Sequence, residues 1–176
     1  LPIYTLVISG TGQAASAEII FNQENPANST LVAPYAKYSQ YITKGVVENG
    51  VTDTGYGTFA FLKNLKTVSL PSSLTEITYS AFEGSGIEEI YLPDSITTIR
   101  NNAFCFCSNL KKIRFSNNLN LIENYAFGRC TSLEEIELPD SLKEIPSGCF
   151  DFCSNLKRVK LPRYLETIGS SAFGMN

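Results

Sequence analysis

Histidine is absent from this 176-residue sequence, and that absence limits the chemistry open to the chain. Serine and cysteine nucleophiles are commonly activated by a neighbouring histidine base, so no Ser-His or Cys-His pair can form here. Gly55-Tyr56-Gly57 is not followed by the Lys-Ser/Thr pair of a phosphate-binding loop. The sequence therefore predicts a protein without enzymatic activity, catalytic residues or a cofactor.

Long apolar runs and a strong net charge are also missing. No run approaches the roughly 18 apolar residues of a membrane-spanning helix, so we expect no insertion into a membrane. Fourteen Lys and Arg against 17 Asp and Glu give a net charge of -3, which gives no reason to expect a nucleic-acid partner. The first residues lack the basic start and apolar core of a signal peptide, so the protein is either intracellular or numbered from a processed end.

The five cysteines form an odd set without metal-site spacing. Three of them, Cys107, Cys130 and Cys153, each follow a phenylalanine by three residues. With no histidine and no C-x-x-C pair, no metal site is expected. Side chains at equivalent positions of stacked units point in parallel, which disfavours a disulfide. We therefore predict reduced, buried thiols that act as small hydrophobes.

A tandem repeat is the main feature that the sequence does contain. Its marker phenylalanines stand at Phe59, Phe82, Phe104, Phe127, Phe150 and Phe173, with separations of 23, 22, 23, 23 and 23 residues. A fixed period between about 20 and 50 residues is typical of a solenoid, in which each unit buries its apolar face against its neighbours. The 22-residue interval contains Glu83-Gly84-Ser85-Gly86, whose glycines permit a shortened turn.

Each repeat begins with an alternating apolar pattern that ends at a proline. The clearest example is Leu133-x-x-Ile136-x-Leu138-Pro139-x-x-Leu142-x-x-Ile145. Alternation is the period of a strand with one buried face, and proline suits the end of a strand because it lacks the N–H of a ladder. We predict a β-rich solenoid over residues 42–176, with about six repeats, the last incomplete, parallel strands along one curved face and little α-helix.

Residues 1–41 do not follow the repeat and are predicted to cap it. Tyr4–Ser9 and Ile19–Phe21 indicate two strands, and Pro34–Tyr41 brings three tyrosines close to the first repeat. The tyrosines fit a cover for the end of the solenoid, and an aromatic binding patch is the alternative. Asn28-Ser29-Thr30 between these segments is the only glycosylation sequon, in a predicted surface loop.

The order Leu-x-x-Ile-x-Leu-Pro-x-x-Leu-x-x-Ile-x-x-x-Ala-Phe-x-x-Cys resembles the BspA-like leucine-rich repeats of bacterial and protist surface-associated proteins. The likeness covers residues 42–176, and Ile8-Ser9-Gly10-Thr11-Gly12 is similar to the family's usual leader. Gly45 and Thr54 in apolar positions, Ser116 for proline and Cys149 for alanine depart from the pattern, and we expect them to weaken local packing. The resemblance implies adhesion or protein binding at the cell surface or after secretion.

The exposed strand positions alternate in charge from one repeat to the next. Equivalent residues should form three rows: Glu88, Lys111, Glu134 and Lys157; Glu89, Lys112, Glu135 and Arg158; and Tyr91, Arg114, Glu137 and Lys160. An exposed ion pair contributes only about 0 to 1 kcal/mol. The structural interpretation is therefore that the rows add little stability and mainly disfavour coils stacked in a wrong register. The functional interpretation is that the face recognises a protein partner.

The residues proposed for partner binding are Glu89, Tyr91, Lys112, Arg114, Glu135, Glu137, Arg158 and Lys160. A structural or assembly module, stacking end to end with further repeats or other copies, is the competing hypothesis. It draws on the expected final strand, Lys157–Leu161, whose outer edge would be unpaired and could pair with further repeats or another chain.

Overall fold

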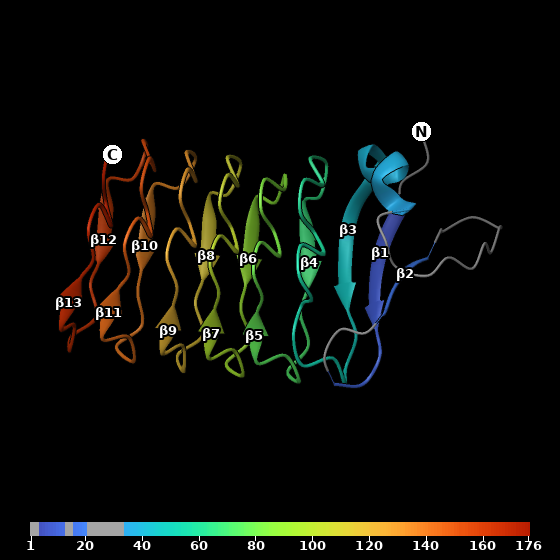
Figure 1. Ribbon diagram of the computed structural model, residues 1–176, viewed down its shortest axis with the longest axis horizontal. Helices are drawn as coiled ribbons and strands as arrows, with labels where there is room; N and C mark the ends of the chain where they lie inside the picture. Colours follow the sequence, from blue (N-terminus) through green and yellow to red (C-terminus); the bar gives the residue numbers. More distant parts are fainter. Residues whose placement is uncertain (1–3, 13–15, 21–33) are drawn as a thin grey trace.

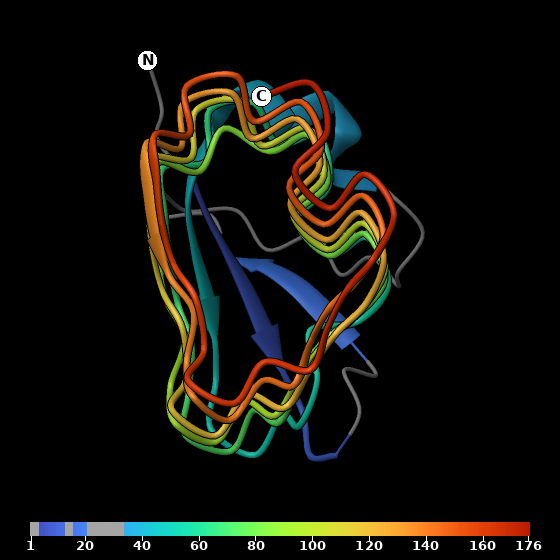
Figure 2. The same ribbon diagram turned by 90° about the vertical axis from the view of Figure 1, so that its left-hand side faces the viewer.

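The computed structural model describes residues 4–12, 16–20 and 34–176, and within them the chain winds into a solenoid. Successive coils stack along the longest axis, and each carries short parallel strands (Figure 1). Viewed along the stack, the coils follow closely similar outlines (Figure 2). The predicted β-rich solenoid is confirmed. We number the coils 1 to 6 by the marker phenylalanine that each contains, from Phe59 to Phe173.

Two rows of strands run along the solenoid, where the sequence predicted parallel strands along one curved face. The first row holds β4 (Thr67–Ser69), β6 (Glu89–Tyr91), β8 (Lys112–Arg114), β10 (Glu135–Glu137) and β12 (Arg158–Lys160). The second row holds β5 (Glu76–Ile77), β7 (Thr98–Ile99), β9 (Leu121–Ile122), β11 (Glu144–Ile145) and β13 (Thr167–Ile168). Each strand pair within these two rows is parallel, as expected of coils that wind in one direction.

The marker phenylalanines form an aromatic spine through the core. Phe59, Phe82, Phe104, Phe127 and Phe150 are fully buried, and Phe173 packs partly buried against them. Neighbouring rings stack with centroids 4.9 to 5.5 Å apart and planes within 10° of parallel. The spine thus buries one large ring from each repeat against its neighbours, as expected of a solenoid with this period.

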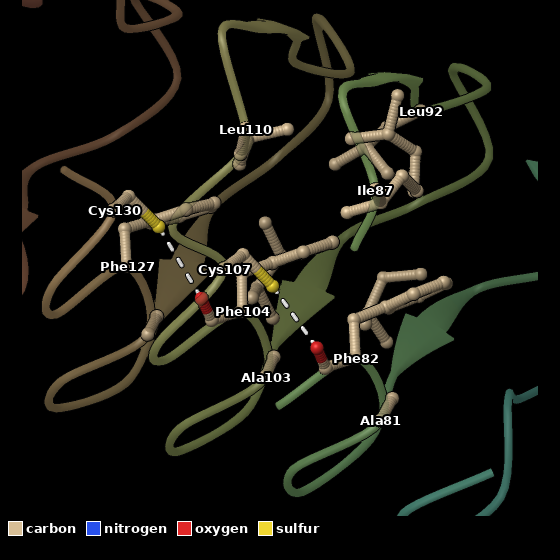
Figure 3. Close-up of a cluster of buried hydrophobic side chains, with 14 of the residues drawn as sticks. Ala81, Phe82, Ile87, Leu92, Ala103, Phe104, Cys107, Leu110, Phe127 and Cys130 are labelled. Atoms are coloured by element: carbon tan, nitrogen blue, oxygen red, sulfur yellow. Dashed lines mark hydrogen bonds between the residues drawn. The ribbon is translucent and has the colours of Figure 1, made fainter. Parts of the chain in front are cut away.

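The repeated cysteines are buried as predicted, and their thiols also donate hydrogen bonds to backbone carbonyl oxygens. Cys107 Sγ donates to Phe82 O at 2.9 Å, and Cys130 Sγ donates to Phe104 O at 3.3 Å (Figure 3). Cys153 Sγ repeats the contact with Phe127 O at 3.2 Å. The described chain holds its five cysteines as free thiols. The thiols of Cys107, Cys130 and Cys153 therefore link each coil to the coil before it, a role that hydrophobic packing alone does not predict.

The first residues extend the first strand row beyond the repeats. β1 (Tyr4–Ser9) lies between β2 (Ser16–Ile20), which is antiparallel to it, and β3 (Ile42–Val47), which is parallel to it and also pairs with β4. The 3₁₀ helix η1 (Pro34–Tyr41) leads into β3, and Tyr4 contacts the rings of Tyr38 and Tyr41 edge-on. It is the only helix in the described ranges, which agrees with the low helix content predicted. Asn28 lies outside the described residues.

Two departures from the repeat pattern fit their surroundings, although the sequence led us to expect weakened local packing. A Cβ on Gly45 would lie 2.7 Å from the Phe59 ring, so the glycine makes room for the spine. Thr54 is buried, but its hydroxyl accepts the Thr78 N–H at 2.9 Å. In the shortened turn, a Cβ on Gly86 would come within 1.8 Å of Lys63 O, which explains why glycine is needed there.

Candidate interaction face

The first strand row places the predicted site residues on one exposed face. Each central residue of a strand points inward and its two neighbours point outward, as in β6 and β10 with buried Ile90 and Ile136. The register pairs Glu89 with Lys112, Tyr91 with Arg114, Glu135 with Arg158 and Glu137 with Lys160. All eight of these side chains are exposed. The structure thus brings them together in the predicted order within each strand pair.

Ion pairs on this face are concentrated between coils 5 and 6. Lys157 Nζ lies 3.0 Å from Glu134 Oε2, and Arg158 and Lys160 pair with Glu135 and Glu137. The contact with Glu137 raises the pKa of Lys160. Between coils 2 and 4, Glu88 binds Lys66 at 2.5 Å and Lys111 at 3.5 Å, and the hydrogen bond from Lys66 is the main cause of its lowered pKa. Because these groups are exposed, the pairs contribute little stability and mainly set side-chain orientation.

The predicted rows are interrupted between coils 4 and 5, where continuity was expected. β6 and β8 form one sheet and β10 and β12 another, with no ladder between β8 and β10 in the described chain. Within residues 34–176, no ion pair joins the basic residues of β8 to the acidic residues of β10. The row is also broken between β4 and β6, at the shortened turn. The face therefore consists of separate strand pairs.

The second strand row carries an ion-pair network that sequence reasoning missed. Arg100 donates to both carboxylate oxygens of Glu76, at 2.9 and 2.8 Å, and to Glu123 at 2.9 Å. These two carboxylates raise the pKa of Arg100 further above its usual value. The signal available was the position: Arg100 and Glu123 each follow the last residue of a second-row strand, so they stand above one another, whereas Glu76 lies within β5 and this signal does not identify it. We interpret this network as structural, because it links coils 2, 3 and 4.

An aromatic column on the turns was also missed. Phe106, Arg129 and Phe152 each stand two residues after a marker phenylalanine and adopt left-handed backbone angles, with φ of 60°, 63° and 56°. The Arg129 guanidinium lies 5.2 Å from the Phe106 ring centroid and 4.3 Å from that of Phe152. Such angles are uncommon for bulky residues. Their recurrence at one repeat position indicates that the turn geometry, rather than an isolated site, requires them.

The described residues offer no metal site, their five thiols are buried, and the hydrogen bond with Cys130 lowers the pKa of Cys153. No cluster of three or more Cys, Asp or Glu residues suited to a metal ion is present among them. Burial raises the pKa of Cys105 to about 11 and that of Cys107 to about 12, and it also raises the pKa of Cys130 and of Cys149. In the same ranges, no helix is long and apolar enough to cross a membrane.

The region that forms the coils, the spine and the cysteine row matches a known family of repeats. A family model described as "BspA type Leucine rich repeat region (6 copies)" matches residues 30–130 and 80–176. The chain belongs to this family. The match includes the last residues of the leader together with the whole repeat region, and the fold implied by the sequence resemblance is therefore confirmed.

Solved structures of leucine-rich repeat proteins are similar to this chain. The T. pallidum leucine-rich repeat protein TpLRR aligns at 25% identity and a TM-score of 0.66 over 73% of this chain. A leucine-rich repeat protein from Bacteroides ovatus aligns at 20% identity and a TM-score of 0.62 over 96% of it. The chain covers 61% and 54% of those two proteins, less than two thirds of either. A search of the curated proteins found no match.

Proposed function

We propose that this chain is a non-enzymatic protein-binding or adhesion module, displayed at a cell surface or secreted, whose first strand row contacts a protein partner. The observation that carries the proposal is the exposed arrangement of eight charged or aromatic side chains on β6, β8, β10 and β12. Each strand is anchored by a buried or partly buried central residue in a stacked core. A rigid backbone of this kind lowers the entropy lost when a partner binds.

The family supports this proposal in general terms. Solenoid proteins typically use one extended surface for recognition, because repeats place equivalent side chains at regular intervals. The near-neutral whole-chain charge and the mixed signs on the face favour a protein partner over nucleic acid.

Neutralising the face tests the proposal. The test variant replaces the seven charged candidates by Gln and Tyr91 by Ser, and its binding to a panel of purified surface and matrix proteins is measured by interferometry. A matched control replaces Lys143, Glu144 and Glu166 by Gln, because these exposed residues lie in or directly before strands of the second row. We expect at least tenfold weaker binding for the face variant and unchanged binding for the control. Equal binding by both variants, at unchanged melting temperature, contradicts the proposal.

An assembly role is the second candidate, and the outer side of coil 6 supports it. Leu161 and Ile168 are 46% and 53% exposed there, although the equivalent residues of coil 5, Leu138 and Ile145, are buried, and Tyr164 beside them is 64% exposed. A further coil or a second copy would cover this surface. Sedimentation velocity over a wide concentration range separates the candidates: a concentration-independent monomer favours partner binding, and concentration-dependent oligomers favour assembly.

A further inference from the structure

The junction between coils 4 and 5 is open on the strand side. Leu92 N–H donates to Arg114 O at 2.9 Å, and Leu138 N–H donates to Lys160 O at 3.0 Å. The Phe115 N–H occupies the equivalent position in coil 4 and has no backbone acceptor within residues 34–176. In the second row, Pro146 replaces a residue whose N–H would bond to coil 4. The two coils are instead joined along their turns, as by Phe127 N–H to Cys149 O at 2.9 Å.

A larger residue, Phe115, stands at the opening in the first row. Inner coils carry Leu92 and Leu138 at this position, and the larger Phe115 ring packs edge-on against Phe127 with centroids 5.5 Å apart. A groove of about 600 Å³ lies at the junction. Its apolar lining includes Phe115, Leu138 and Pro139, and its uncharged polar lining includes Asn117 and Ser141. Its charged lining comprises Arg114, Lys160, Glu137 and Asp140, and the two carboxylates pair with Lys160 and Arg163 of coil 6.

The charges at this junction are unbalanced because coil 5 directs its acidic groups away from coil 4. Glu134, Glu135 and Glu137 all pair with basic residues of coil 6. Arg114 consequently has no carboxylate partner in the described chain, and Lys112 lies over the Tyr91 ring, 5.7 Å from its centroid. Tyr91 is 51% exposed beside them. A cationic and aromatic surface therefore borders a partly apolar groove.

We propose that this junction binds an acidic peptide segment of a protein partner. A partner carboxylate pairs with Arg114, whose planar guanidinium can donate two parallel hydrogen bonds. An adjacent apolar side chain of the segment enters the groove over Leu138 and Pro139, and Lys112 and Tyr91 contact the flanking residues. This inference rests on the proposed function and specifies the chemistry of its partner.

Selection from a displayed library of random linear peptides tests the site without knowledge of the natural partner. The bait is the full chain, and the selected peptides are then measured against Arg114→Gln, Arg114→Lys and Arg129→Gln. Arg129 is the matched control, since it is an exposed arginine of the same coil on the turn column. We expect peptides enriched in Asp and Glu, about tenfold weaker binding to Arg114→Gln, a smaller loss with Arg114→Lys and no loss with Arg129→Gln. Binding should also weaken as NaCl is raised.

The other outcomes overturn the inference. A selection that yields no binders, or binders without acidic residues, contradicts an acidic ligand. Acidic peptides that bind Arg114→Gln as tightly as the parent chain, but lose binding to the face variant, place the site elsewhere on the face and leave the proposed function intact. Peptides that still bind the face variant contradict the proposed function as well. Melting curves for each variant separate lost binding from lost folding.

Discussion

Phe127 is the residue whose removal should damage the fold most, because it stacks between Phe104 and Phe150 and also contacts Phe115. Phe127→Ala should lower the free energy of unfolding by about 3 to 5 kcal/mol, through lost contacts and the cavity left behind. Phe106→Ala is the matched control, since this ring is 48% exposed, and its cost should be much smaller. Urea unfolding followed by circular dichroism measures both. A Phe127→Ala midpoint equal to that of the parent contradicts the spine.

The buried thiols should be almost inert in the folded protein. Cys107 is fully buried with its pKa raised to about 12, so the native thiolate fraction stays small at pH 8. A thiol reagent should react slowly with native protein and with five thiols after denaturation. Fewer than five thiols in denatured, unreduced protein would reveal a disulfide or a modification.

The same pKa shift gives a pH dependence with a definite sign. Because the folded pKa of Cys107 lies above that of a free thiol, the unfolded state ionises first as the pH rises. This contribution to stability is complete below about pH 8.5 and is lost progressively towards pH 12. Cys107→Ser should flatten the alkaline decline of the melting temperature, and Ser85 shows that serine fits this row, since it is buried at the equivalent position in coil 2.

At the scale of the strand, the open junction predicts uneven protection of backbone amides. The Phe115 amide should exchange with solvent at least about tenfold faster than those of Leu92 and Leu138, which are bonded to the next coil. Hydrogen exchange followed by NMR compares the three amides directly. Equal protection at all three positions would indicate that β8 and β10 form a ladder in solution, and it would remove the basis of the groove.

The strands and the spine could be predicted from the sequence because each depends on local pattern. The segment Ile136-x-Leu138-Pro139 specifies a strand of alternating apolar residues that ends at the proline, and the phenylalanine period specifies that the repeats stack. The open junction could not be predicted, since Phe115 satisfies the apolar pattern as well as leucine does. The pairing of Glu137 was also undetermined, because Arg114 and Lys160 lie 23 residues before and after it. Because the sequence spacing is the same in both directions, only the three-dimensional distance between coils shows which of the two basic residues pairs with Glu137.

At the scale of the whole molecule, each coil is stabilised by contacts with its neighbours. On the strand face, the open junction separates the ion pairs between coils 5 and 6 from those among coils 2 to 4. Reversing Glu134, Glu135 and Glu137 to Lys places like charges opposite the basic residues of coil 6. The melting temperature should fall in 10 mM NaCl and recover in 1 M NaCl, where the screening length is only about 3 Å. Hydrogen exchange should show the loss mainly in coils 5 and 6, because solenoid coils contact only their neighbours. Reversing Lys157, Arg158 and Lys160 to Glu in the same protein should restore the parent melting temperature, and failure of this rescue would mean that the pairs do not position coil 6.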